Sequence, residues 1–299
     1  MHALVAKLSP PDRLTILWLA ALVLVAVASH PVPLAALALA ASTAAVVVAV
    51  ANWGTRSRVG RVVHDFLPIA TIFAVFNLAG PVIAAANPRR WDGVLAAVDE
   101  RFFGSLAHAW RHALGRPAWL TDLASLAYVS LYFVPLALAI AAYRARPRRE
   151  FDAFVFALMT AFFLPYVGYL LCPATGPRVS AGALGGGVVT AVVQDVLRAG
   201  EINRLDAFPS GHTTVSLTFL ALGARSFPRW RVPLVVSAAS ILFSTVYLSM
   251  HYVTDVVAGA IVAAIVPAAV TLFERIVSGD VHVLQAVPHQ VRPTDVRSR

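Results

Sequence analysis

Two short polar clusters interrupt an otherwise apolar chain, and both contain a histidine. The first is Phe208-Pro209-Ser210-Gly211-His212-Thr213-Thr214, and the second is His251-Tyr252-Val253-Thr254-Asp255. Histidine can transfer protons near neutral pH and can attack an electrophile through an unprotonated ring nitrogen. A carboxylate beside a histidine can hold its ring in one tautomer. These residue types together indicate acid–base or nucleophilic catalysis.

The first cluster has the pattern of a helix start. Pro209-Ser210-Gly211 predicts a helix that begins near Gly211, so the backbone N–H groups around Gly211 and His212 would have no partner within the helix. Such a terminus binds phosphate or a similar anion, and glycine lets a ligand approach the backbone closely. The plainer interpretation of the same residues is a capped helix start without a ligand.

In the second cluster, His251 and Asp255 are four residues apart, which would place them on one face of a helix. Asp255 would then take the proton on one ring nitrogen of His251 and leave the other free to attack. His212 could protonate the leaving oxygen as general acid. A local His–Asp hydrogen bond and metal ligation are the alternatives. No further His, Cys or carboxylate cluster with metal-ligand spacing accompanies these residues, so we expect no metal and no cofactor.

The chain around these clusters has the composition of an integral membrane protein. Of its 299 residues, 59% are hydrophobic and 13% are charged, and the mean hydropathy is +0.75. An ordinary soluble domain has about 25% charged residues. This composition excludes intrinsic disorder, and the single cysteine, Cys172, excludes a disulfide scaffold. Eight apolar stretches predict an all-α polytopic membrane bundle, with spans near 14–30, 33–51, 66–86, 121–142, 151–171, 211–227, 232–250 and 254–274.

The order of these spans places both clusters on one side of the membrane, because the chain between His212 and His251 crosses once and returns. Lys and Arg are concentrated in the connections on the side of the termini, which predicts cytoplasmic termini. The net charge of +9 comes from arginines between apolar runs rather than from a basic stripe with interleaved aromatics. Nucleic acid is therefore not expected as a partner. We expect the first stretch to be a retained span rather than a cleaved signal peptide, because it leads directly into the second.

Two long connections, 87–120 and 172–210, are expected on the extracytoplasmic side. The first alternates apolar and charged residues at helical spacing with several Trp and Phe, which predicts an interfacial amphipathic helix. The second is rich in Gly and Pro, which predicts irregular backbone near the membrane surface. The expected organisation is two spans and a cytoplasmic loop (1–65), a six-span core with the interfacial helix (66–275), and a cytoplasmic basic tail (276–299).

The string Pro209-Ser210-Gly211-His212 and the pair His251 and Asp255 resemble the second and third signatures of the type 2 phosphatidic acid phosphatase superfamily, which also contains vanadium haloperoxidases. The resemblance implies a helical bundle with a metal-free site at the membrane surface. It implies that His251 forms a phosphohistidine, that Asp255 orients it and that His212 is the general acid. Stretches 91–104 and 172–178 are similar to the inositol phosphorylceramide synthase branch, and 251–256 is similar to sphingomyelin synthases.

The chain also departs from the superfamily pattern at two cationic positions. Its first signature, a lysine followed by six residues and then Arg-Pro, is absent, because Arg116-Pro117 has Ala109 at the lysine position. The arginine expected six residues before the third-signature histidine is replaced by Thr245. Our hypothesis is that Arg178, and secondarily Arg204, supply the missing positive charge. With Ser210 and Gly211 they form the expected phosphate-binding group.

The sequence therefore predicts a membrane enzyme that moves a phosphoryl or phospho-headgroup unit at the extracytoplasmic face through His251. Water as acceptor would make it a lipid phosphatase, acting on a phosphatidate-like lipid or a polyprenyl phosphate. A lipid hydroxyl as acceptor would make it a transferase, for example of phosphoinositol. The expected partners are membrane lipids, and the strong preference for arginine over lysine suggests a bacterial inner membrane. The alternative is a lipid transporter or scaffold with a degenerate site.

Overall fold

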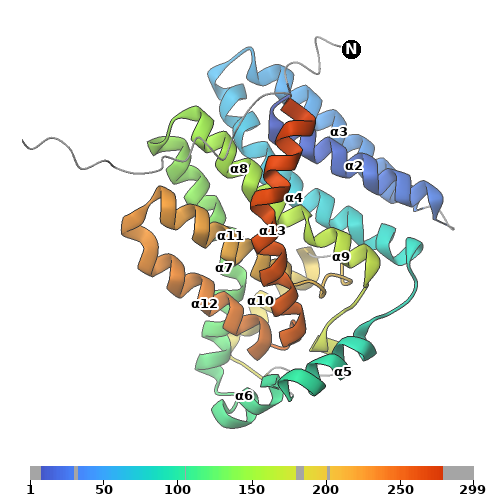
Figure 1. The fold of residues 1–299 in the computed structure, drawn as a ribbon, viewed down its shortest axis with the longest axis vertical. Coiled ribbons are helices and arrows are strands. Elements are labelled where there is room, and N and C mark those ends of the chain that lie inside the picture. Colours follow the sequence, from blue (N-terminus) through green and yellow to red (C-terminus); the bar gives the residue numbers. More distant parts are fainter. Residues whose placement is uncertain (1–7, 30–32, 105, 180–184, 201–202, 279–299) are drawn as a thin grey trace, which may run out of the picture.

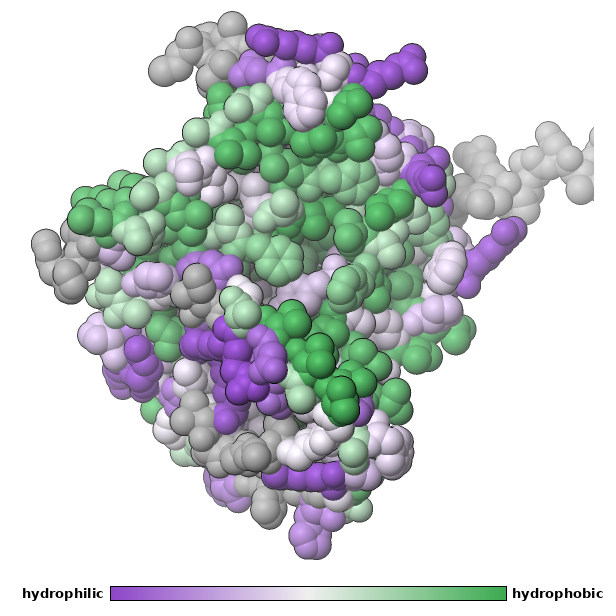
Figure 2. Space-filling view, turned by 180° about the vertical axis from the view of Figure 1, so that it is seen from behind, coloured by the Kyte–Doolittle hydropathy of each residue, from purple (hydrophilic) through white to green (hydrophobic). Residues whose placement is uncertain are grey.

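The computed structural model describes residues 8–29, 33–104, 106–179, 185–200 and 203–278. All regular elements within these ranges are helices, which confirms the expected all-α class. In the part of the chain that the structure describes, seven helices are long and apolar enough to cross a membrane. Large apolar side chains such as Leu24, Leu34 and Val232 are 72–74% exposed, as lipid-facing residues would be. Figure 2 shows apolar side chains gathered in a broad band on one face of the molecule, with hydrophilic side chains above and below it.

The long helices follow the expected spans closely, because apolar runs of about 20 residues set their positions. Pro165 divides the fifth span into two helices, since it lacks the N–H that an unbroken helix needs. The sixth expected span is a helix of only 16 residues. The helices are α2 (Pro10–Ala28), α3 (Leu34–Gly54), α4 (Arg58–Ala86), α7 (Ala118–Ala145), α8 (Arg148–Phe163), α9 (Pro165–Leu171), α11 (Gly211–Ser226), α12 (Arg231–Tyr247) and α13 (Val253–Ser278).

Helix α11 lies at the centre of the bundle and packs against α7, α8, α12 and α13 (Figure 1). Its side chains Val215 and Phe219 are fully buried. Small polar residues such as Thr214 allow close packing, and the Thr214 hydroxyl donates to the Gly259 carbonyl of α13 at 2.9 Å. The short α11 is therefore enclosed by four other helices, with its N-terminus fixed beside the start of α13.

Helices α2 and α3 pack on the side of α4. A group of charged residues joins them to the core, and we call Asp12, His64, Asp65 and Arg148 the N-terminal clasp. The His64 Nε2 atom lies 2.7 Å from the Asp12 carboxylate, and Arg148 pairs with Asp65. Asp12 and Asp65 are 1% and 4% exposed. The clasp thus links α2, α4 and α8 through two pairs whose carboxylates are buried, while Arg148 is about half exposed.

The connection 87–120 forms two helices rather than the single one expected. Helix α5 (Asp92–Phe103) ends at Gly104, whose φ of 57° is the left-handed conformation that favours glycine, and α6 (Leu106–Leu114) follows. Both lie at the end of the molecule away from the N-terminus (Figure 1).

The connection 172–210 was expected to be irregular, and that expectation is wrong for part of it, because it contains helix α10 (Val188–Gly200). The three glycines at 185–187 favour a loop, and the apolar residues at helical spacing that form α10 begin directly after them. The carboxylate of Asp122 on α7 accepts hydrogen bonds from the Gly187 N–H and from the N–H and hydroxyl of Thr190, which fixes the start of α10.

The expected division into three parts stays a prediction. Helix α4 begins at Arg58, so residues on both sides of position 65 belong to one helix. The basic tail beyond Ser278 lies outside the described residues.

Candidate active site

The start of α11 is as the sequence predicts. Ser210 is the N-cap, and its side chain accepts a hydrogen bond from the Thr213 N–H at 3.2 Å. The Ser210 N–H donates to the backbone carbonyl of Asp255 at 2.9 Å. This bond joins the first cluster directly to the second.

Gly211 allows a close approach at this helix start. A Cβ atom at position 211 would lie 2.6 Å from the hydroxyl oxygen of Tyr169, which is closer than side chains tolerate. Gly211→Ala is therefore expected to displace the α11 terminus and lower turnover by about 10-fold or more. Adding Tyr169→Phe removes the obstructing hydroxyl and should restore part of the loss in steady-state assays. A double variant no better than Gly211→Ala would contradict this steric account.

His251 lies before α13 rather than within it. Helix α12 ends at Tyr247, Ser249 has a φ of 58°, and α13 begins at Val253. The expectation that His251 and Asp255 share a helix face is therefore wrong. The two residues still meet, because Asp255 lies in the first turn of α13 with its Oδ2 atom 3.5 Å from the His251 Nδ1 atom.

The nearest partner of His251 Nδ1 is a backbone carbonyl that the sequence did not indicate. This atom lies 2.9 Å from the Ala207 oxygen. A carbonyl oxygen only accepts hydrogen bonds, so Nδ1 must carry the proton. In the neutral ring Nε2 is then unprotonated and available as a nucleophile. Asp255 Oδ2 accepts a bond from the Tyr252 N–H at 2.8 Å, so it supports the same loop.

His212 faces His251 across the site, with their ring centroids 5.7 Å apart. This distance confirms that the two clusters return to the same side. The His212 ring stacks on Tyr128 at 4.0 Å and the residue is 8% exposed. Its Nε2 atom is buried and has no hydrogen-bond partner among the described residues. A buried ring nitrogen without a partner is suited to a group that the substrate supplies.

Arg178 is also in the site, but with a partner that the sequence reasoning missed. Its guanidinium donates to the Asp206 carboxylate at 2.7 Å and to the Arg204 carbonyl at 2.8 Å. It is close enough to His212 for an electrostatic interaction. The Arg204 side chain instead donates to the Arg198 carbonyl at the end of α10. Of the two arginines, the structure brings only the Arg178 guanidinium toward the histidines.

Thr245 and Ala109 occupy the two positions at which the superfamily pattern has a cation. Thr245 is fully buried in α12, and its carbonyl accepts hydrogen bonds from the backbone N–H groups of Met250 and His251. Ala109 is exposed on α6. Thr245 thus supports the His251 loop through its backbone. No described group of three or more His, Cys, Asp or Glu residues is arranged to hold a metal ion.

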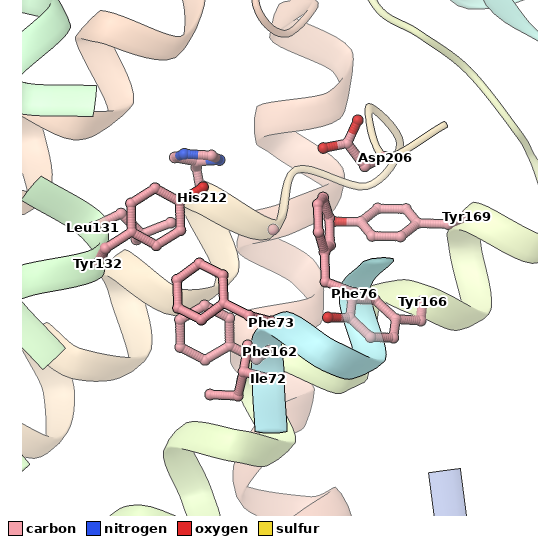
Figure 3. Close-up of a pocket in the computed structure, with 11 residues that line it drawn as sticks. Ile72, Phe73, Phe76, Leu131, Tyr132, Phe162, Tyr166, Tyr169, Asp206 and His212 are labelled. Atoms are coloured by element: carbon pink, nitrogen blue, oxygen red, sulfur yellow. The ribbon is translucent and has the colours of Figure 1, made fainter. Parts of the chain in front are cut away.

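An aromatic pocket leads away from His212 into the bundle (Figure 3). Its empty volume is about 540 Å³, which includes space open to the outside. Phe73 is 46% exposed and lies 5.4 Å from the ring of Tyr132. The lining residues are Ile72, Phe73, Phe76, Leu131, Tyr132, Phe162, Tyr166, Tyr169, Asp206, Gly211 and His212.

The pocket has a polar end and an apolar end. Asp206 and His212 lie at the polar end (Figure 3). Ile72, Phe73 and Phe76 come from the middle part of α4 (Arg58–Ala86), about 15 Å or more from its end at Ala86 at 1.5 Å per residue. The apolar end of the pocket therefore lies beside the middle of a helix that is long and apolar enough to cross a membrane.

Comparison with known proteins adds a family match and two short similarities. The family model described as PAP2 superfamily matches residues 93–269, more than half of the chain. A lipid A 1-phosphatase of Rhizobium etli is 41% identical over 54 residues, which are 18% of this chain and 23% of that protein. A lipid A 1-phosphatase of Rhizobium johnstonii is 41% identical over 54 residues, 18% of this chain and 22% of that protein. The chain thus aligns with about a quarter of these relatives' length. No solved structure matches.

Proposed function

Because the chain belongs to the PAP2 superfamily, we propose that it is a membrane lipid phosphatase that acts through His251. The observation that carries the proposal is the His251–His212 pair at the polar end of the aromatic pocket. The His251 Nδ1 atom is held by the Ala207 carbonyl, so Nε2 is the free nitrogen. The names of the two Rhizobium relatives support a lipid phosphate as substrate.

The reaction has two balanced steps. In the first, His251 Nε2 attacks phosphorus, the N–P bond forms, and the P–O bond to the lipid breaks. Protonated His212 gives its proton to the leaving lipid oxygen. In the second, His212 takes a proton from water, the resulting hydroxide oxygen bonds to phosphorus, and the N–P bond breaks. Inorganic phosphate leaves and both histidines return to their starting states.

Negative charge that develops on the phosphoryl oxygens needs donors in fixed positions. The Arg178 guanidinium and the N-terminus of α11, at Ser210 and Gly211, are the proposed donors. Asp206 neutralises Arg178 before substrate binds, since the two are 2.7 Å apart. The guanidinium must therefore share its donors between Asp206 and the phosphate when the substrate is bound.

The pairing of Arg178 with Asp206 favours a second candidate function, which is transfer of a phospho-headgroup to a lipid hydroxyl. A phosphomonoester carries close to two negative charges near neutral pH, whereas a diester carries one. A site whose arginine already has a carboxylate partner is suited to the smaller charge. Phosphoinositol transfer would use the same His251 intermediate, with a lipid hydroxyl in place of water in the second step.

The pocket supports a lipid rather than a water-soluble substrate. A lipid phosphate at the histidines would place its chain among Phe76, Phe162 and Tyr166, where apolar surface is removed from water (Figure 3). We propose that the site faces the extracytoplasmic side and that both termini are cytoplasmic, because of the distribution of arginine between the connections. The preference for arginine over lysine and the bacterial relatives support a bacterial inner membrane.

The deciding experiment measures phosphate release by purified full-length protein in detergent. The panel contains phosphatidate, a polyprenyl phosphate and lipid A, with wild type compared with His251→Asn. Release by wild type alone establishes a phosphatase. No release from any of these lipids, together with headgroup transfer from phosphatidylinositol to diacylglycerol or ceramide, establishes the transferase. Absence of both reactions leaves a transporter or scaffold and overturns the proposed function.

A further inference from the structure

Helix α5 contains two aspartates, Asp92 and Asp99, that the reaction does not use. They are seven residues apart, which is close to two helical turns and places both on one face. Asp99 is 5% exposed and Asp92 is partly buried. Leu95, on the same face, packs with Ala174 and Ala207 of the two loops beside the site. This face of α5 therefore points toward the site.

Asp92 holds the loop that contains Arg178. Its Oδ1 atom accepts hydrogen bonds from the N–H of Thr175 at 2.9 Å, from the Thr175 hydroxyl at 3.1 Å and from the N–H of Gly176 at 2.9 Å. The N–H of Trp91, the preceding residue, donates to the Pro173 carbonyl at 3.0 Å. Four hydrogen bonds thus connect the start of α5 to the segment just before Arg178.

Asp99 holds the start of α13 in the same way. Its Oδ1 atom accepts bonds from the Thr254 N–H at 2.9 Å and the Thr254 hydroxyl at 3.1 Å. Thr254 precedes Asp255 and is three residues after His251. A carboxylate at a helix N-terminus satisfies N–H groups that have no partner within the helix and also interacts favourably with the helix dipole.

The two loops that α5 holds also touch each other. Gly176 has a φ of 79°, and a Cβ atom there would lie 2.5 Å from the carbonyl oxygen of Met250. Tyr252 lies between the loops and α5. Its burial, and then the nearby carboxylates of Asp92, Asp255 and Asp99, raise the pKa of its phenol to about 12. A shift of α5 would therefore move the Arg178 loop and the His251 loop together.

We propose that Asp92 and Asp99 are positioning residues, and that α5 holds Arg178 and His251 at their working separation. The inference rests on the proposed function, because it assigns these residues a role in that reaction. Catalytic groups displaced by about 1 Å can lose about 100-fold in rate. Hydrogen bonds from one rigid helix to both loops prevent such a displacement.

Asp122 supplies a matched control. Its carboxylate also accepts two backbone N–H groups and a threonine hydroxyl, but it holds the start of α10, which contains none of the proposed site residues. Replacing it removes a capping interaction of the same chemistry at a place where no catalytic group should move.

The experiment compares Asp99→Ala, Asp92→Ala and Asp122→Ala in detergent, with kcat, KM and the thermal unfolding midpoint measured for each. We expect Asp99→Ala to lower kcat by about 10-fold or more with KM within about twofold, because the nucleophile moves. Asp92→Ala should lower kcat/KM by a similar factor through Arg178. Asp122→Ala should keep kcat within about twofold while its unfolding midpoint falls as in the other variants. Asp99→Asn retains an acceptor oxygen and should recover most of kcat.

Equal losses of kcat in the Asp99→Ala and Asp122→Ala variants would overturn the inference, as would full activity of Asp99→Ala. If Asp99→Ala does not fold, Thr254→Val removes only the hydroxyl bond and should still lower kcat. Activity of wild type separates the two ideas, because an inactive wild type rejects the proposed function, whereas an active wild type with an active Asp99→Ala rejects only the positioning role.

Discussion

Replacing His251 with asparagine is expected to lower lipid phosphate release by about 1,000-fold or more, because it removes the ring nitrogen that we propose attacks phosphorus. The asparagine amide can still donate a hydrogen bond to the Ala207 carbonyl, which His251 Nδ1 approaches to 2.9 Å. The variant should therefore unfold near the wild-type temperature. Phosphate release and thermal unfolding measured on the same preparations check both parts.

His112 provides the control for this replacement, since it is an exposed histidine on α6. His112→Asn should release phosphate at the wild-type rate. Rapid quenching of wild type with labelled lipid should also trap acid-labile phosphate on the protein, and the His251→Asn variant should trap none. Release within tenfold of wild type by His251→Asn would mean that water attacks phosphorus directly.

Replacing Arg178 with alanine is expected to lower kcat/KM by about 100-fold or more, because the site loses the guanidinium that we propose as a donor to the phosphoryl oxygens. The change also leaves the Asp206 carboxylate without its 2.7 Å partner. Some stability should be lost as well, since a partly buried carboxylate then has no cation beside it. Steady-state kinetics and thermal unfolding measure the two effects separately.

A double variant separates binding of phosphate from neutralisation of Asp206. Arg178→Ala with Asp206→Asn removes the unpaired carboxylate, so stability should recover while activity stays low. Recovery of activity in the double variant would show that Arg178 serves only to neutralise Asp206. Arg178→Lys keeps one charge but loses the forked donor geometry and should have intermediate activity.

The positions of the membrane helices could be predicted from the sequence because each depends on a local apolar run. The start of α11 could be predicted for a similar reason, since Pro209, Ser210 and Gly211 favour one local backbone conformation. The meeting of the two histidines followed from counting spans. Each of these inferences uses information that is contiguous in the chain.

The hydrogen-bond partners in the site could not be predicted in this way. Asp206 pairs with Arg178 across 28 positions, and the Ala207 carbonyl meets His251 across 44. No local pattern identifies such partners, and a backbone carbonyl has no signature in the sequence at all. The four-residue spacing of His251 and Asp255 was also misleading, because α13 begins only at Val253.

The N-terminal clasp has a consequence for any shortened form of the chain. The carboxylates of Asp12 and Asp65 are almost fully buried, and each has its partner on another helix, His64 on α4 and Arg148 on α8. Removing one member of such a pair costs stability, because the remaining group keeps its burial but loses its counterpart. A protein that begins at α4 would lack Asp12 and leave His64 without its 2.7 Å partner. The first two helices therefore contribute to the stability of the core that holds the site, although they supply none of its proposed residues.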